Sequence, residues 1–156
     1  MLINSINSVK LKRVSDMSGL FEIATSKDMF QHLESKYQVY LSTPSTGTLL
    51  DALFPFSHLQ EWIEKEGSQN DDKIAKKFVE LLFKSEDYRI IRELCNHTKH
   101  FRKKSAPDTT IVKGARAGLS RAGDNLGHVY LLVGNQDIRV HLSAVYKIYS
   151  DYFNHK

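Results

Sequence analysis

Residues Ser85 to Lys104 read SEDYRIIRELCNHTKHFRKK, and this stretch decides the fold. Ser85 followed by two acids is typical of a helix start, because a serine side chain caps free N–H groups and acids favour the positive end of the helix dipole. Residues 102–104 are basic, which suits the negative end of the dipole. Pro107 prevents the helix from continuing. The sequence therefore predicts a long helix over 85–104, with the rest of the chain packed around it.

Apolar and polar residues of this helix separate onto two sides when they are placed about 100° apart. The side expected to face the core holds Ile90, Leu94, Thr98 and Phe101, with Ile91 and Cys95 beside them. The opposite side holds Arg89, Arg92, Asn96, Lys99, His100 and Lys103, and His97 lies between the two. Glu93 is the only acid after Asp87, so we expect few ion pairs on this polar side. Arginine and lysine neutralise phosphate, asparagine orients it and histidine moves protons near neutral pH, so the pattern favours a phosphate-binding face over a merely solvated one.

Two short motifs overlap in this helix. RELCNH, from Arg92 to His97, matches R-x-x-x-x-H, and NHTKH, from Asn96 to His100, matches N-x-x-K-H. These motifs resemble those of HEPN-like helical domains of small bacterial proteins. SHLQEWI at 57–63 is similar to the helix that precedes the motif helix in those proteins, and the likeness covers most of 21–153. The resemblance implies a metal-independent endoribonuclease of a prokaryotic toxin or defence system. Its active site would form where the motif helices of two subunits meet.

The resemblance also implies roles for single residues. Arg92 would stabilise charge on the transferring phosphate, and either His97 or His100 would be the general acid or base. Arg89, Asn96, Lys99 and Lys103 would bind the substrate. Because Arg92 and His97 point about 140° apart on a straight helix, their joint action requires a distortion or a second subunit. The expected partners are RNA, a second copy in a homodimer and an antitoxin or regulatory protein.

A non-catalytic helical module is the alternative, binding nucleic acid, a nucleotide or a protein partner through the basic face of residues 89–103. Other chemistries find little support in the sequence. The zinc motif H-E-x-x-H is absent, and His97 and His100 have no identifiable third ligand, so we expect no metal and no cofactor. Cys95 lies beside the core stripe, where cysteine behaves as a small apolar residue.

Length and composition are those of one globular domain. The chain has 156 residues, of which 41% are hydrophobic and 26% charged, and a net charge of +4 is compatible with a nucleic-acid partner without requiring one. One cysteine excludes an internal disulfide. No run approaches the roughly twenty apolar residues of a membrane span, and no signal-peptide pattern opens the chain. We therefore expect a cytoplasmic protein without a membrane partner.

The remaining elements complete a mainly α fold, a helical bundle of four to five helices with a small β-hairpin before the C-terminal helix. Helices are expected at about 26–41, 47–66, 71–84 and 142–153, with a kink or break near Leu53 caused by Pro55. A short strand at 109–112 lies in a polar connector whose basic part, 113–127, could form a flap, and the hairpin pairs 128–133 with 138–140. Residues 1–24 form an arm or an irregular segment. The residues expected to be buried together are Trp62, Phe78, Leu81, Leu94, Phe101, Val145 and Tyr149.

Overall fold

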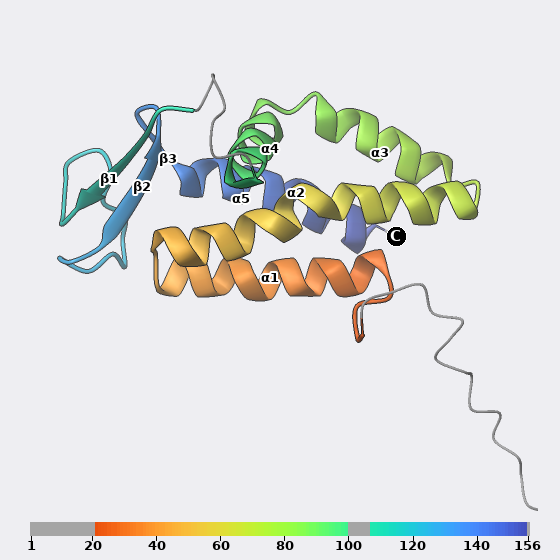
Figure 1. Ribbon diagram of the computed structural model, residues 1–156, viewed down its shortest axis with the longest axis horizontal. Coiled ribbons are helices and arrows are strands. Elements are labelled where there is room, and N and C mark those ends of the chain that lie inside the picture. Colours follow the sequence, from red (N-terminus) through yellow and green to blue (C-terminus); the bar gives the residue numbers. More distant parts are fainter. Residues whose placement is uncertain (1–20, 100–106, 156) are drawn as a thin grey trace, which may run out of the picture.

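Helices make up most of the molecule, and a small sheet covers one end of the bundle (Figure 1). The computed structural model describes residues 21–99 and 107–155. The elements are α1 (Ser26–Ser42), α2 (Thr46–Gln69), α3 (Lys73–Phe83), α4 (Glu86–Lys99), β1 (Thr109–Lys113), β2 (Val129–Val133), β3 (Gln136–Asp137) and α5 (Ile138–Asn154). The fold class predicted from the sequence, a mainly α bundle with a small β-hairpin before the C-terminal helix, is confirmed. The hairpin is part of a three-stranded antiparallel sheet. The predicted part of the helix beyond Lys99 lies outside the described residues.

Helices α1 and α2 begin with the same device, a reciprocal cap. The Thr25 hydroxyl accepts from the Asp28 N–H at 3.1 Å, and the Asp28 carboxylate accepts from the Thr25 N–H at 2.9 Å. Ser45 and Thr48 form the corresponding box at the start of α2. Each box satisfies N–H groups that a helix start otherwise leaves without partners. The Ser45 box lies at the turn between α1 and α2, and these two helices lie side by side (Figure 1).

Helix α2 runs without interruption through Pro55, so a break near Leu53 does not occur. Near its C-terminal end, α2 approaches α3 closely at Gly67. A Cβ atom added to Gly67 would lie 2.5 Å from the Cβ of Ala75, a distance that real side chains do not tolerate. Asp72 caps α3 by accepting hydrogen bonds from backbone N–H groups two and three residues further on. The missing side chain at Gly67 therefore lets α3 fold back tightly against α2.

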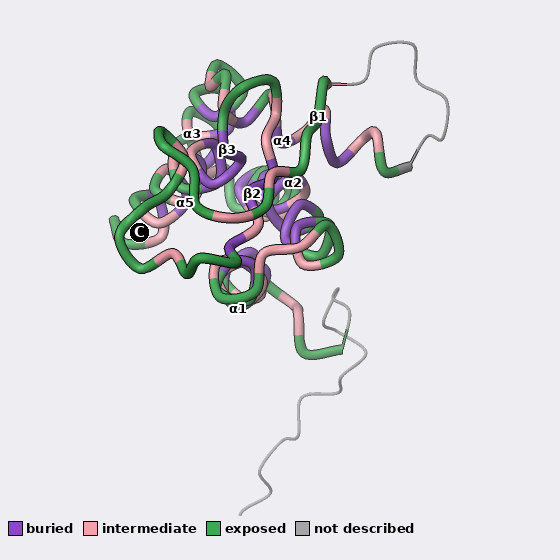
Figure 2. Tube along the Cα trace, turned by 90° about the vertical axis from the view of Figure 1, so that its left-hand side faces the viewer, coloured by how far each residue is buried: buried purple, intermediate pink, exposed green. Residues whose placement is uncertain are grey.

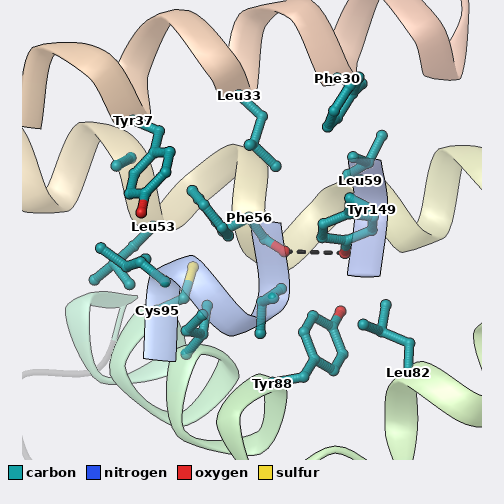
Figure 3. Packing of buried hydrophobic residues seen from close by; sticks show 14 of the residues in the cluster. Phe30, Leu33, Tyr37, Leu53, Phe56, Leu59, Leu82, Tyr88, Cys95 and Tyr149 are labelled. Carbon is teal, nitrogen blue, oxygen red and sulfur yellow. Dashed lines mark hydrogen bonds between the residues drawn. The ribbon is translucent and has the colours of Figure 1, made fainter. Parts of the chain in front are cut away.

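The core lies where α1, α3, α4 and α5 pack against α2 (Figure 3). Phe30, Leu33 and Tyr37 of α1 point toward Leu53, Phe56 and Leu59 of α2. Val145 and Tyr149 are fully buried and Leu94 nearly so, as expected, while Trp62 and Phe78 are half-buried against the same cluster. The prediction for Leu81 is wrong, because this side chain is 56% exposed. Phe101 lies outside the described residues.

Two tyrosines fasten α4 and α5 to the middle of α2. The Tyr149 hydroxyl donates to the carbonyl oxygen of Phe56 at 3.1 Å (Figure 3), and the Tyr88 hydroxyl donates to the carbonyl oxygen of Ser57 at 2.9 Å. Burial raises the pKa of both phenols, so each stays a neutral donor throughout the physiological range. The bonds fix where α4 and α5 cross α2.

The sheet is antiparallel, with the order β1-β2-β3. The short strand expected at 109–112 is confirmed as β1, and Ile111 lies opposite Leu131 of β2. The expected strand at 138–140 is wrong, because α5 begins at Ile138. Asp137 explains the difference: its carboxylate accepts from the N–H of Arg139 and so caps a helix at this point. The loop between β1 and β2 is mostly exposed (Figure 2).

Candidate nucleic-acid interface on α4

The side of α4 that faces the core agrees only in part with the side that its sequence pattern predicted. Ile91, Leu94 and Cys95 are buried as expected, and Tyr88 is buried as well. Thr98, expected in the core stripe, is exposed, and Ile90 is half-buried. The large ring of Tyr88 accounts for the shift, because its hydroxyl bond to α2 and its complete burial draw the helix toward that side.

Arg89 is paired with acids on both sides along the helix. Its Nε donates to Glu86 Oε2 at 2.8 Å, and its Nη1 donates to Glu93 Oε1 at 2.5 Å. The hydrogen bonds that Arg89 donates to Glu86 in the first place, and to Glu93, raise the pKa of the guanidinium. The expectation that ion pairs are scarce on this face is therefore wrong around Arg89. Its charge is compensated before any ligand arrives, which weakens the expected role of Arg89 in substrate binding.

Arg92 has a different environment. It is half-buried, and its guanidinium carbon lies 4.6 Å from the ring centroid of Phe83 and 5.9 Å from that of Tyr88. Arg92 forms no ion pair with a residue that the structure describes. Attraction between a cation and an aromatic face holds such a group in place without neutralising it. Arg92 is therefore an oriented cation whose charge is available to a ligand.

His97 lies on the other flank of α4 and is half-buried. It lines an apolar groove between α2, α4 and the sheet, whose walls include Leu50, Leu53, Leu94, Ile111 and Leu131. Arg92, by contrast, lies against Phe83 at the end of α3. Within one chain the structure does not bring Arg92 and His97 together, in agreement with the wide angle between them on a straight helix.

The four other expected site residues lie in the last turn of α4 or beyond it. Asn96 is half-buried and makes no side-chain hydrogen bond to a described residue. Lys99 is the last residue of α4, while His100 and Lys103 lie outside the described residues. Which of His97 and His100 would be the general acid or base stays a prediction.

A buried ionic network at the base of the β1–β2 loop was not anticipated from the sequence. The guanidinium of Arg139, 6% exposed, donates from Nη1 to Asp124 Oδ1 and from Nε to Asp137 Oδ2, both at 2.8 Å. The Tyr130 hydroxyl donates to Asp124 at 3.1 Å. Hydrogen bonds from Arg139 are the main reason that the pKa of Asp124 falls well below its usual range. The network anchors the loop that the sequence suggested as a flap, and the signal for it, an aspartate just before a helix, was present at Asp137.

Over residues 21–99 and 107–155, no group of three or more His, Cys, Asp or Glu side chains is placed to bind a metal ion. None of the helices in this part of the chain is both long and apolar enough to cross a membrane. No protein-family model matches the chain, and neither a curated protein nor a solved structure matches it. The resemblance to HEPN-like domains therefore stays a prediction, made from sequence motifs between Arg92 and His100 alone.

Proposed function

We propose that this protein is a helical module that binds RNA through the outer side of α4, with a phosphate site centred on Arg92. The observation that carries the proposal is the contrast between the two arginines of the helix. Arg89 is compensated by Glu86 and Glu93, whereas Arg92 forms no ion pair with a described residue and is held over Phe83. A cation that is oriented but not neutralised is what an incoming phosphate requires.

The chemistry around Arg92 suits single-stranded nucleic acid in particular. A guanidinium carries five N–H donors, so aromatic contact at its carbon leaves donors for phosphate oxygens. Phe83 remains 44% exposed, and an aromatic ring beside a cation is the combination on which unpaired bases stack. Asn96 follows Arg92 by four residues and so lies on the same side of the helix, where its amide can donate to the backbone or a base. The resemblance to HEPN-like domains favours RNA over DNA.

A binding measurement tests the proposal with a control on the same helix. Fluorescence anisotropy of a labelled single-stranded RNA should show that Arg92→Ala weakens binding about tenfold and lowers the salt slope by about one. Arg89→Ala should change the affinity much less, because it removes a charge that Glu86 and Glu93 already compensate. Equal effects of the two substitutions, or binding that does not depend on salt, would contradict a phosphate site at Arg92.

Metal-independent RNA cleavage, as in a prokaryotic toxin or defence system, is the second candidate. It is favoured by His97, which makes no hydrogen bond to a described residue and so keeps a ring nitrogen for proton transfer. Two subunits whose α4 helices faced each other would supply Arg92 from one chain and His97 from the other. RNA incubated with the protein in EDTA should then give products ending in a 2′,3′-cyclic phosphate.

Alanine substitutions separate cleavage from binding. His97→Ala or His100→Ala should lower the cleavage rate by about 10²- to 10⁴-fold while RNA binding is retained. If the native protein binds RNA but does not cut it, the ribonuclease candidate is rejected and the binding module stands.

A further inference from the structure

The outer edge of β1 carries a row of backbone groups without partners in the described structure. β1 is the first strand in the order β1-β2-β3, so only one of its edges is paired. Two backbone bonds at the ends of the ladder show which residues point inward. The Gly114 N–H donates to the His128 carbonyl at 2.9 Å, and the Gly134 N–H donates to the Asp108 carbonyl at 2.7 Å.

Residues in an antiparallel strand alternate in direction, so these two bonds fix the whole strand. Residues 108, 110, 112 and 114 direct their backbone groups toward β2. Thr109, Ile111 and Lys113 therefore direct theirs outward. The outward set is centred on Ile111, contains no proline and carries one charged side chain.

The side chains at this edge leave apolar surface beside the unpaired backbone. Ile111 lies opposite Leu131, which is buried, so both side chains are on the sheet face that turns toward the helices. Ile111 is nevertheless 57% exposed, and Leu50, on the α2 wall of the same groove, is 44% exposed. His97 also lines this groove, on the flank of α4 opposite Arg92. An added strand at this edge would cover the apolar groove and hydrogen-bond to β1 at the same time.

We propose that the strand added to this edge is β1 of a second copy, running antiparallel and centred on Ile111. In that register Ile111 faces Ile111 of the second copy, and Thr109 faces Lys113. All outward N–H and C=O groups then find partners, in about six hydrogen bonds. The single charge on each strand faces a threonine instead of its own copy, so no like charges are opposed. Two three-stranded sheets become one, related by a two-fold axis, which is the commonest symmetry of protein dimers.

This surface differs from the Arg92 side of α4, so the proposal does not rest on RNA binding. It specifies which flank of α4 is closed on dimerisation: the flank of His97. An extended segment of some other protein could satisfy the same backbone groups, but it would not share the symmetry about Ile111. The register of self-association therefore distinguishes the proposal.

Sedimentation velocity over a range of protein concentrations provides the first test. The native chain should form dimers, and Ile111→Asp should weaken the dimer about 100-fold or more, because it removes apolar contact and places two carboxylates face to face. Leu126→Asp is the matched control, since Leu126 is 86% exposed in the β1–β2 loop and lies away from the strand edge. A native protein that stays monomeric, or a dimer insensitive to Ile111→Asp, would overturn the proposal.

A disulfide test checks the register without relying on a destabilised variant. Facing residues in a hydrogen-bonded antiparallel pair have Cα atoms about 5.5 Å apart, within reach of a disulfide. Ile111→Cys should therefore give a covalent dimer on mild oxidation. Thr110→Cys should not, because Thr110 faces Val112 of the second copy. Cys95 is buried and does not compete. A native dimer in which Thr110→Cys cross-links as readily as Ile111→Cys, or neither does, would show that dimerisation uses another surface.

Discussion

The Nδ1 atom of His141 lies 2.7 Å from Oδ1 of Asp87, which joins the first turns of α5 and α4. The imidazole is buried, whereas the carboxylate is partly open to solvent. The two residues are far apart in the sequence, so their contact reports the packing of the two helices directly. Together with the tyrosine bonds to α2, it fixes how α4 presents Arg92 and His97.

A double-mutant cycle should show that this pair couples the helices. His141→Ala and Asp87→Ala should each lower the free energy of unfolding by about 1.5–3 kcal/mol, the usual range for a hydrogen bond to a charged group. The double variant should lose about 0.5–1 kcal/mol less than the sum of the two, because the second substitution removes a contact that is already broken. Urea unfolding measures all three values. Strict additivity would show that the contact contributes nothing to stability.

Acid should weaken the fold through Asp124. Its pKa is lower in the folded chain than in the unfolded one, so its contribution to stability is present above the unfolded value of about 3.9 and is lost as the pH falls below it. Asp124→Asn should therefore be less stable than the native chain by about 2 kcal/mol at neutral pH, and the difference should shrink in acid. Urea midpoints between about pH 7 and pH 2 test this.

Asp51→Asn is the control variant for the acid experiment, since Asp51 is an exposed aspartate on α2. This variant should follow the native chain at every pH. A constant gap between Asp124→Asn and the native chain down to the lowest pH would mean that the Asp124 carboxylate is not what stabilises the loop.

Removing the hydroxyl groups of Tyr88 and Tyr149 should loosen α4 and α5 from α2. Tyr88→Phe and Tyr149→Phe each delete a donor to a buried carbonyl, which should cost about 1 kcal/mol apiece. Tyr37→Phe is the matched control, because Tyr37 is buried but its hydroxyl makes no hydrogen bond to a described residue. Thermal unfolding should give Tyr37→Phe a higher melting temperature than Tyr88→Phe or Tyr149→Phe. The reverse order would argue that ring packing, and not the hydroxyl bonds, anchors these helices.

Gly67→Ala should destabilise the protein although alanine is the better helix former. The added Cβ would overlap that of Ala75, and overpacking of this kind costs about 1–3 kcal/mol. Gly47→Ala should be neutral or stabilising, because its nearest neighbour would be Ser45 Oγ at 3.8 Å. Ala75→Gly should restore part of the loss when combined with Gly67→Ala. Failure of that rescue would mean that α2 and α3 are separated by something other than this contact.

Helix positions could be predicted because local signals mark them. Thr25 with Asp28 fixes the start of α1, and the turn residues after it separate α1 from α2. The start of α4 was equally clear from Ser85 and the two acids that follow it. These signals act over a few residues, so the chain order alone is sufficient to read them.

Where a helix has two apolar faces, the sequence could not predict which one is buried, because tertiary packing decides it. Helix α3 carries two adjacent apolar stripes, one of Ile74, Phe78 and Leu81 and the other of Ala75, Val79 and Leu82. The second stripe is buried, since Ala75 is small enough to meet Gly67. Arg139 is a similar case: its acidic partners lie in a distant loop and at a helix cap, and neither periodicity nor composition indicates them.

The contact between Gly67 and Ala75 constrains how this fold can diverge. Position 67 has no room for a single additional carbon, so a descendant chain can change it only if position 75 shrinks in exchange or α3 moves away. The charged side chains of α4 are under no comparable geometric restriction. Common ancestry should therefore be traceable through paired small residues at 67 and 75 long after the polar surface of α4 has been replaced.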